Sequence, residues 1–71
     1  MPREIPIRGE VIRLGELLKL AGVVATGGEA KHLLASTDVL VNGEPDTRRG
    51  RQLHAGDEVR VGDEHLLVVA D

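Results

Sequence analysis

The chain has 71 residues, carries a formal net charge of −3 at pH 7, and contains no Cys, Trp, Tyr or Phe. This length predicts one domain over residues 1–71, and the lack of cysteine excludes disulfides and thiolate metal sites. Because no apolar stretch is long enough to span a membrane and the N-terminus lacks the apolar region of a signal peptide, we expect a soluble, cytoplasmic domain.

An edge strand and a helix are predicted in the first third of the chain. Ile5 and Ile7 alternate with Glu4, Pro6 and Arg8, and proline is tolerated at a sheet edge but not in a central strand. A helical stripe follows, with apolar residues at i, i+3, i+4 and i+7, and Gly22 is a plausible C-terminal stop. The stripe consists of Leu14, Leu17, Leu18 and Ala21, whereas Arg13, Glu16 and Lys19 lie off it and should face solvent.

A second helix is predicted after a capping box. The Thr26 hydroxyl can accept a hydrogen bond from the Glu29 amide, while the Glu29 side chain reaches back to the Thr26 amide. The helix should direct apolar side chains inward and Lys31 outward, and it should end near residues 36–38. The two short helices then form a helix–turn–helix-like pair.

The rest of the chain is typical of strands and turns. Residues 39–41 lead into Asn42-Gly43, the strongest short-range hairpin signal. Gly56-Asp57 begins another turn before a strand over 58–61, and residues 62–64 separate it from an apolar strand over 65–69, which could be an exposed edge. The predicted fold class is α+β, with two short helices packed on a small antiparallel sheet.

Enzymatic chemistry finds little support in this sequence. His32, His54 and His65 are the only histidines, and their spacing matches no common zinc pattern. Ser36 is the only serine and lies in no nucleophile-elbow motif. We therefore expect no enzyme, no metal, no cofactor and no small-molecule substrate.

Basic side chains are the better candidate for a binding site. No acidic residue lies between Thr47 and Gly56, so this window carries +3 within an acidic chain. The planar fork of arginine suits phosphate, and outward basic residues of the two helices could join the same surface. The candidate residues are Arg13, Lys19, Lys31, Arg48, Arg49 and Arg51. The alternative is that the loop arginines are solvated or paired with Asp46 and Glu44.

The backbone at the start of the second helix is a further candidate for phosphate contact. The amides of Gly27 and Gly28 could receive a phosphate there. The Glu29 carboxylate argues against this contact, because it competes for the same amides.

The missing aromatic residues constrain the ligand. Proteins that bind single strands usually stack bases on aromatic rings, so structured RNA, bound through its backbone and shape, is the more plausible partner. The alternative function is a protein–protein adaptor, because residues 57–71 carry a net charge of −4 that could contact a basic partner. Nothing in the sequence demands a dimer, and we expect a monomer.

The order of these features resembles the RNA-binding S-four domain, named after ribosomal protein S four of the small subunit and also called the αL motif. The resemblance covers residues 11–61, with loop features closest to the small stand-alone bacterial members. The residues that carry it are Arg13-Leu14, Leu17-Leu18, Gly22, Glu29-Ala30-Lys31, Val39-Leu40-Val41-Asn42-Gly43 and Gly56-Asp57-Glu58-Val59, together with Thr26-Gly27-Gly28 and Arg48-Arg49-Gly50-Arg51.

This resemblance implies that the ligand is structured RNA, either ribosomal or transfer RNA. In the family, basic residues of the helix pair and the adjoining loop contact the RNA backbone, which corresponds here to Arg13, Lys31, Arg48, Arg49 and Arg51. Lys19 is supported by its outward helical phase. Many members carry an arginine where this chain has Gly27, so one phosphate contact is either missing or replaced by backbone amides. No catalytic domain of the larger members is expected here.

Overall fold

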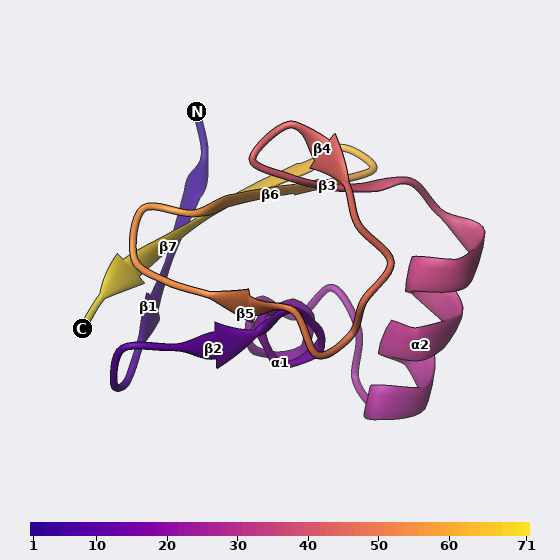
Figure 1. Ribbon diagram of the computed structural model, residues 1–71, viewed down its shortest axis with the longest axis horizontal. Helices are drawn as coiled ribbons and strands as arrows, with labels where there is room; N and C mark the ends of the chain where they lie inside the picture. Colours follow the sequence, from indigo (N-terminus) through magenta and orange to yellow (C-terminus); the bar gives the residue numbers. More distant parts are fainter.

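The computed structural model describes residues 1–71 and contains a five-stranded sheet, a two-stranded ribbon and two helices (Figure 1). The large sheet has the strand order β1-β7-β6-β3-β4. Its strands are β1 (Arg3–Ile7), β3 (Val39–Val41), β4 (Glu44–Pro45), β6 (Glu58–Val61) and β7 (Glu64–Ala70). The ribbon pairs β2 (Ile12–Arg13) with β5 (Gln52–Leu53), and the helices are α1 (Leu14–Leu20) and α2 (Gly27–Ser36).

The α+β class is confirmed, but two expectations about the sheet are wrong. The sheet is mixed rather than antiparallel, because β1 runs parallel to β7 with Ile5 opposite Val68. Strand β1 is an edge strand, as predicted, and it covers the outer side of β7. Consequently β7 lies between β1 and β6 and is not an exposed edge. The β1–β7 pairing joins the two ends of the chain, so no local sequence pattern indicates it.

The helices begin and end close to where their sequence signals lie. Helix α1 ends next to Gly22, whose φ of +78° is the left-handed conformation that favours glycine at a helix C-terminus. At the start of α2 the Thr26 hydroxyl accepts a hydrogen bond from the Glu29 amide at 3.1 Å. The Glu29 carboxylate accepts from the Ala25 amide at 3.4 Å rather than from the Thr26 amide. The second bond of the capping box is therefore displaced by one residue.

The hydrophobic core lies between the helices and one face of the large sheet. Alternate residues of β1, β3, β6 and β7 point into it, as Val59 and Val61 do while Arg60 between them is exposed. Leu14, Leu17 and Leu18 of α1 have no exposed surface at all. The core comprises Ile5, Ile7, Ile12, Leu14, Leu17, Leu18, Val24, Ala30, Leu34, Val39, Val41, Leu53, Val59, Val61, Leu66 and Val68. Aliphatic side chains thus fill the interior in the absence of aromatic rings.

The Asn42-Gly43 turn is hydrogen-bonded to the turn at Gly56-Asp57. Asn42 (φ +52°) and Gly43 (φ +84°) both adopt left-handed conformations, as a tight hairpin between β3 and β4 requires. The Asn42 side-chain amide donates to Asp57 at 3.1 Å, and its oxygen accepts from the Glu58 amide at 2.9 Å. Asp57 also accepts from the His54 amide at 2.7 Å. The β3–β4 hairpin is thereby fastened to the turn that precedes β6.

Two further observations bear on function. Neither helix is long and apolar enough to cross a membrane. The structure contains no group of three or more His, Asp or Glu side chains arranged to hold a metal ion.

Candidate nucleic-acid interface

The arginine-rich loop between β4 and β5 is attached to the N-terminus of α1. The loop passes α2 and reaches α1 before it enters β5 (Figure 1). Arg13, the residue before α1, makes no side-chain cap. Instead, the Leu14 amide donates to the Arg51 carbonyl at 2.8 Å and the Gly15 amide donates to the Arg49 carbonyl at 2.9 Å. The loop therefore satisfies backbone donors that a helix start leaves without partners.

Gly15 permits this close approach. An ideal Cβ at Gly15 would lie 2.5 Å from Cγ of Arg49 and 3.4 Å from its carbonyl oxygen. Gly15 is buried, and it is the second residue of α1 although glycine has poor helix propensity. Sequence reasoning did not single out this position. The available signal was a glycine inside the predicted helix, where it costs about 1 kcal/mol relative to alanine.

A hollow of about 300 Å³ lies where α1, the start of α2 and the loop meet. No hydrophobic residue lines it, and its cations come from the continuous β2–α1 segment and from the β4–β5 loop. The lining residues are Arg13, Gly15, Glu16, Lys19, Gly27, Arg49 and Gly50. Three cations and one carboxylate give the lining a net charge of +2. Three of the predicted basic residues and one predicted glycine are thus brought together.

Arg49 extends across this hollow toward α2. Its Nη1 donates to the Gly27 carbonyl at 3.4 Å, and no carboxylate contacts its guanidinium within salt-bridge distance. Most of its N–H donors remain available for a ligand, because one long hydrogen bond uses only one of five. Glu16 also lines the hollow, although the sequence predicted only that it faces solvent. Its carboxylate is the one negative charge of the lining.

The remaining helix residues of the predicted site lie in different places. Lys31 is exposed and lies four residues after Gly27, on the same side of α2 one turn further along. Gly28 does not line the hollow, but borders a separate groove with Thr26 and Val23. The Glu29 carboxylate bonds the Ala25 amide and not the glycine amides, so the competition expected from it is not observed.

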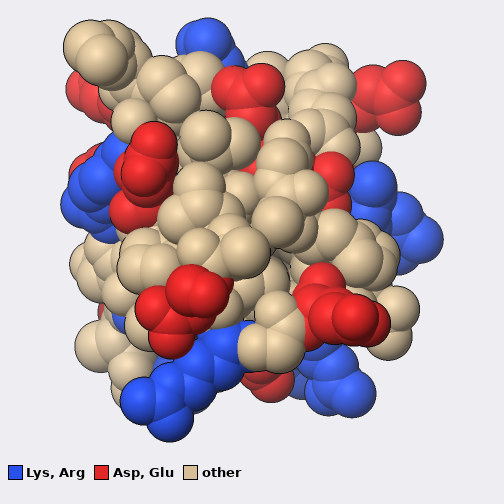
Figure 2. Space-filling model, turned by 90° about the vertical axis from the view of Figure 1, so that its left-hand side faces the viewer, with Lys and Arg blue, Asp and Glu red and all other residues tan.

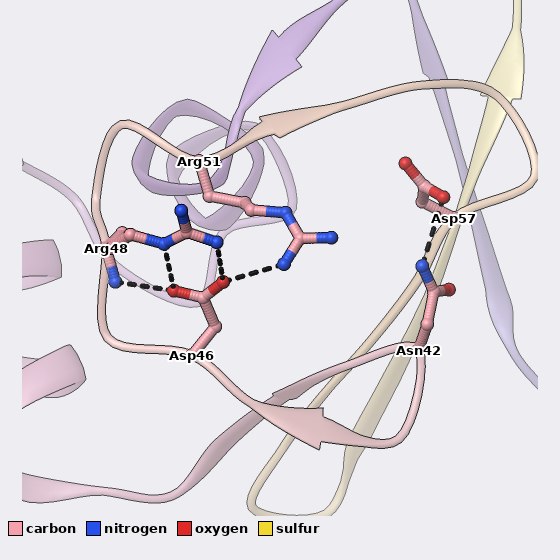
Figure 3. Close-up of polar contacts among 5 residues, drawn as sticks. All are labelled: Asn42, Asp46, Arg48, Arg51 and Asp57. Carbon is pink, nitrogen blue, oxygen red and sulfur yellow. Dashed lines mark hydrogen bonds and ion pairs between the residues drawn. The ribbon is translucent and has the colours of Figure 1, made fainter.

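The sequence allowed that loop arginines pair with Asp46 and Glu44. Arg48 and Arg51 are indeed paired with Asp46 (Figure 3), whereas Glu44 forms no ion pair with them. The Asp46 side chain is only 6% exposed and forms 2.8 Å ion pairs with both arginines. Hydrogen bonds from the Arg48 side chain hold the pKa of the Asp46 carboxyl far below its ordinary value, and bonds from the Arg48 amide and Arg51 add to this effect against the opposing effect of burial. The same pairing raises the pKa of Arg48. The three loop arginines therefore divide into one free cation and two paired ones.

The face of the molecule at the left of Figure 1 has no comparable basic surface. Figure 2 shows this face, on which acidic and basic side chains lie next to one another over tan surface. No single-sign patch dominates it. The hollow is formed instead by α1, α2 and the loop.

Comparison with known proteins agrees with this architecture. A family model described as the S4 domain, the S-four domain of the sequence analysis, matches residues 5–69. The chain is 52% identical over 61 residues to the probable ribosome maturation protein RlbA of Bacillus subtilis (strain 168), and the match covers 86% of each chain.

Proposed function

This chain belongs to the S4 domain family, and we propose on that premise that it is a non-enzymatic protein that docks on structured RNA through the hollow between α1, α2 and the arginine loop. Ribosomal RNA is the favoured target, because a relative is named as a ribosome maturation protein. Transfer RNA is the second candidate target. The protein would act as a monomer in the cytoplasm, where ribosomes are assembled.

The observation that carries this proposal is the convergence of Arg13, Lys19 and Arg49 on one hollow. These residues come from the end of β2, from α1 and from the β4–β5 loop, within a chain whose net charge is −3. Concentrated cations in an acidic protein favour a polyanionic ligand, since each neutralised phosphate also releases counterions. Without aromatic rings for base stacking, the contacts would be made to phosphates and 2′-hydroxyls.

The other predicted residues extend this interface. Lys31 would add a point charge one helical turn beyond Gly27, and the Gly27 amide at the start of α2 could contact a phosphate directly. Arg48 and Arg51 would present the donors that Asp46 leaves free. Gly28 has the weakest support, because it borders a different groove.

A salt titration of binding to a structured RNA and to a DNA duplex of matched length tests the proposal. We expect RNA binding that weakens steeply with salt, and much weaker binding to DNA. Arg49→Ala should weaken RNA binding and reduce the log–log salt slope by about 1. Arg60→Ala is the matched control, because Arg60 is exposed on the sheet face opposite the core and its replacement removes the same charge.

Two results would contradict the proposal. Equal losses for Arg49→Ala and Arg60→Ala would indicate nonspecific attraction without a site at the hollow. Absence of RNA binding at low salt, together with a protein pull-down that survives nuclease and high salt, would favour the adaptor function instead.

A further inference from the structure

We propose that Asp46 is a positioning residue for RNA binding: it holds Arg48 and Arg51 side by side so that their unused N–H groups face the phosphate backbone. This inference rests on the proposed function. It concerns a carboxylate, a group that by its own charge repels RNA.

The geometry of Asp46 is that of a buried acceptor with every bond directed to the loop. Its Oδ1 accepts from the Arg48 amide at 2.8 Å and from Arg48 Nε at 3.1 Å. Its Oδ2 accepts from Arg48 Nη2 and from Arg51 Nη1, both at 2.8 Å. A buried carboxylate is tolerated only when it is paired and hydrogen-bonded, and here two arginines from one short loop supply all the side-chain partners (Figure 3).

The N–H groups of each guanidinium that bond Asp46 determine which N–H donors remain for a ligand. Arg48 uses its Nε and one Nη, which is the side-on fork of the guanidinium. The end-on fork, made of Nη1 and the second proton of Nη2, is left free, and Nη1 points away from Asp46 in Figure 3. The Arg48 side chain remains 69% exposed despite its ion pair. A guanidinium held on one side can still form a bidentate contact with two phosphate oxygens on the other.

Arg51 is held in a complementary way. It donates a single Nη1 bond to the same Oδ2 atom, and its side chain is 31% exposed. Its backbone carbonyl accepts from the Leu14 amide, so the loop position of Arg51 is fixed to α1. The carboxylate thus fixes two long, flexible side chains before RNA arrives, which reduces the entropy lost on binding.

The charge of Asp46 allows a test by the sign of the effect. Asp46→Asn raises the formal charge of the protein by one unit, and simple electrostatics therefore predicts tighter RNA binding. Loss of positioning predicts weaker binding, because both guanidinium groups become free to rotate. The two explanations predict opposite changes in affinity for the same substitution.

The experiment compares the affinity of a structured ribosomal RNA fragment for the parent, Asp46→Asn, Arg48→Ala and the double variant, at a temperature where circular dichroism shows each to be folded. We expect Asp46→Asn to weaken binding about fivefold. In the Arg48→Ala background the same substitution should weaken binding less than about twofold, since one of the positioned groups is already gone. Asp63→Asn in the exposed β6–β7 turn is the control with the same change of charge.

A second measurement needs no variant of Asp46. In the parent protein the Arg48 Nε–H resonance should remain protected from solvent exchange when RNA is added, because the side-on bond to Asp46 persists in the complex. Loss of this protection on RNA binding would show that RNA displaces Asp46, and would overturn the inference.

The outcomes separate this inference from the proposed function. Equal or tighter RNA binding by Asp46→Asn would refute the positioning role while RNA binding by the parent stands. A loss that is unchanged in the Arg48→Ala background would show that Asp46 does not act through Arg48, and would refute the joint positioning of the two arginines. If the parent binds no RNA, the proposed function and this inference fail together.

Discussion

Gly15→Ala is the substitution that most directly tests how the arginine loop is held against α1. The new Cβ would lie 2.5 Å from Arg49 Cγ, 3.3 Å from its Cδ and 3.4 Å from its carbonyl oxygen. Carbon atoms pack at about 3.5–4.0 Å, so Arg49 Cγ must move by roughly 1 Å. Because the position of Cγ depends only on χ1, this movement requires another χ1 rotamer or a shift of the loop backbone.

The expected loss of stability is the balance of two terms. Overpacking of this kind costs about 1–3 kcal/mol, and replacing glycine by alanine in a helix recovers about 0.5–1 kcal/mol. The net destabilisation is therefore about 1 kcal/mol, which for a domain of this size lowers Tm by about 4–8 °C. Thermal unfolding followed by circular dichroism measures this change.

Gly28→Ala is the matched control for stability. Gly28 is the second residue of α2, as Gly15 is of α1, and its added Cβ would meet only the Thr26 hydroxyl at 3.8 Å, an ordinary contact. This variant should keep its Tm or raise it. If Gly15→Ala raised Tm as well, the close packing of the loop on α1 would be refuted.

The same substitution should also affect RNA binding. Displacing the Arg49 side chain should weaken RNA binding by about as much as Arg49→Ala does, and the two changes combined should be much less than additive. Additive losses would mean that Gly15 acts independently of Arg49.

Three further predictions concern charge and turn geometry. The pKa of Asp46 and the pKa of Asp57 both lie below the ordinary value of 3.8. Burial alone would raise the pKa of Asp57. Hydrogen bonds from the His54 amide and Asn42, together with nearby positive charges, outweigh this effect of burial. The stability from both carboxylates should therefore be present above about pH 4 and decline below it, and urea unfolding of Asp46→Asn should show a shallower acid dependence. Asn42→Ala should lower the free energy of unfolding by about 2 kcal/mol, because two hydrogen bonds are lost at a residue with positive φ; an unchanged urea midpoint would contradict this. Glu16→Gln should tighten RNA binding about twofold by removing the only carboxylate of the hollow, and weaker binding would instead identify Glu16 as a ligand contact.

Local signals predicted both helices and the strands β1, β3, β6 and β7, but not the β2–β5 ribbon. The spacing of the leucines indicated α1, the Thr26 hydroxyl caps α2 as expected, and Gly22 and Asn42-Gly43 adopt the positive φ angles that their positions require. Each of these features depends on residues within a few positions of one another, where backbone geometry dictates which groups meet. The family was recognisable from the same features and is confirmed over residues 5–69.

Long-range contacts were not predictable in the same way. The parallel pairing of β1 with β7 joins the ends of the chain. The hydrogen bond from Asn42 to Asp57 links two turns that the sequence shows only as separate signals. Which strands pair and which turns meet is determined by how the whole sheet assembles. The periodicity within a single segment does not encode these long-range partners.

The site shows the same division. The order of residues was enough to predict that the helix cations face outward and that three arginines lie together in an acidic chain. The folded chain was needed to see that Arg49 shares a hollow with Arg13 and Lys19, while Arg48 and Arg51 bond the buried Asp46. Neighbouring arginines in a loop can point in different directions. Their directions depend on which loop carbonyls cap α1 and on which carboxylate becomes buried, and both follow from packing of the whole chain.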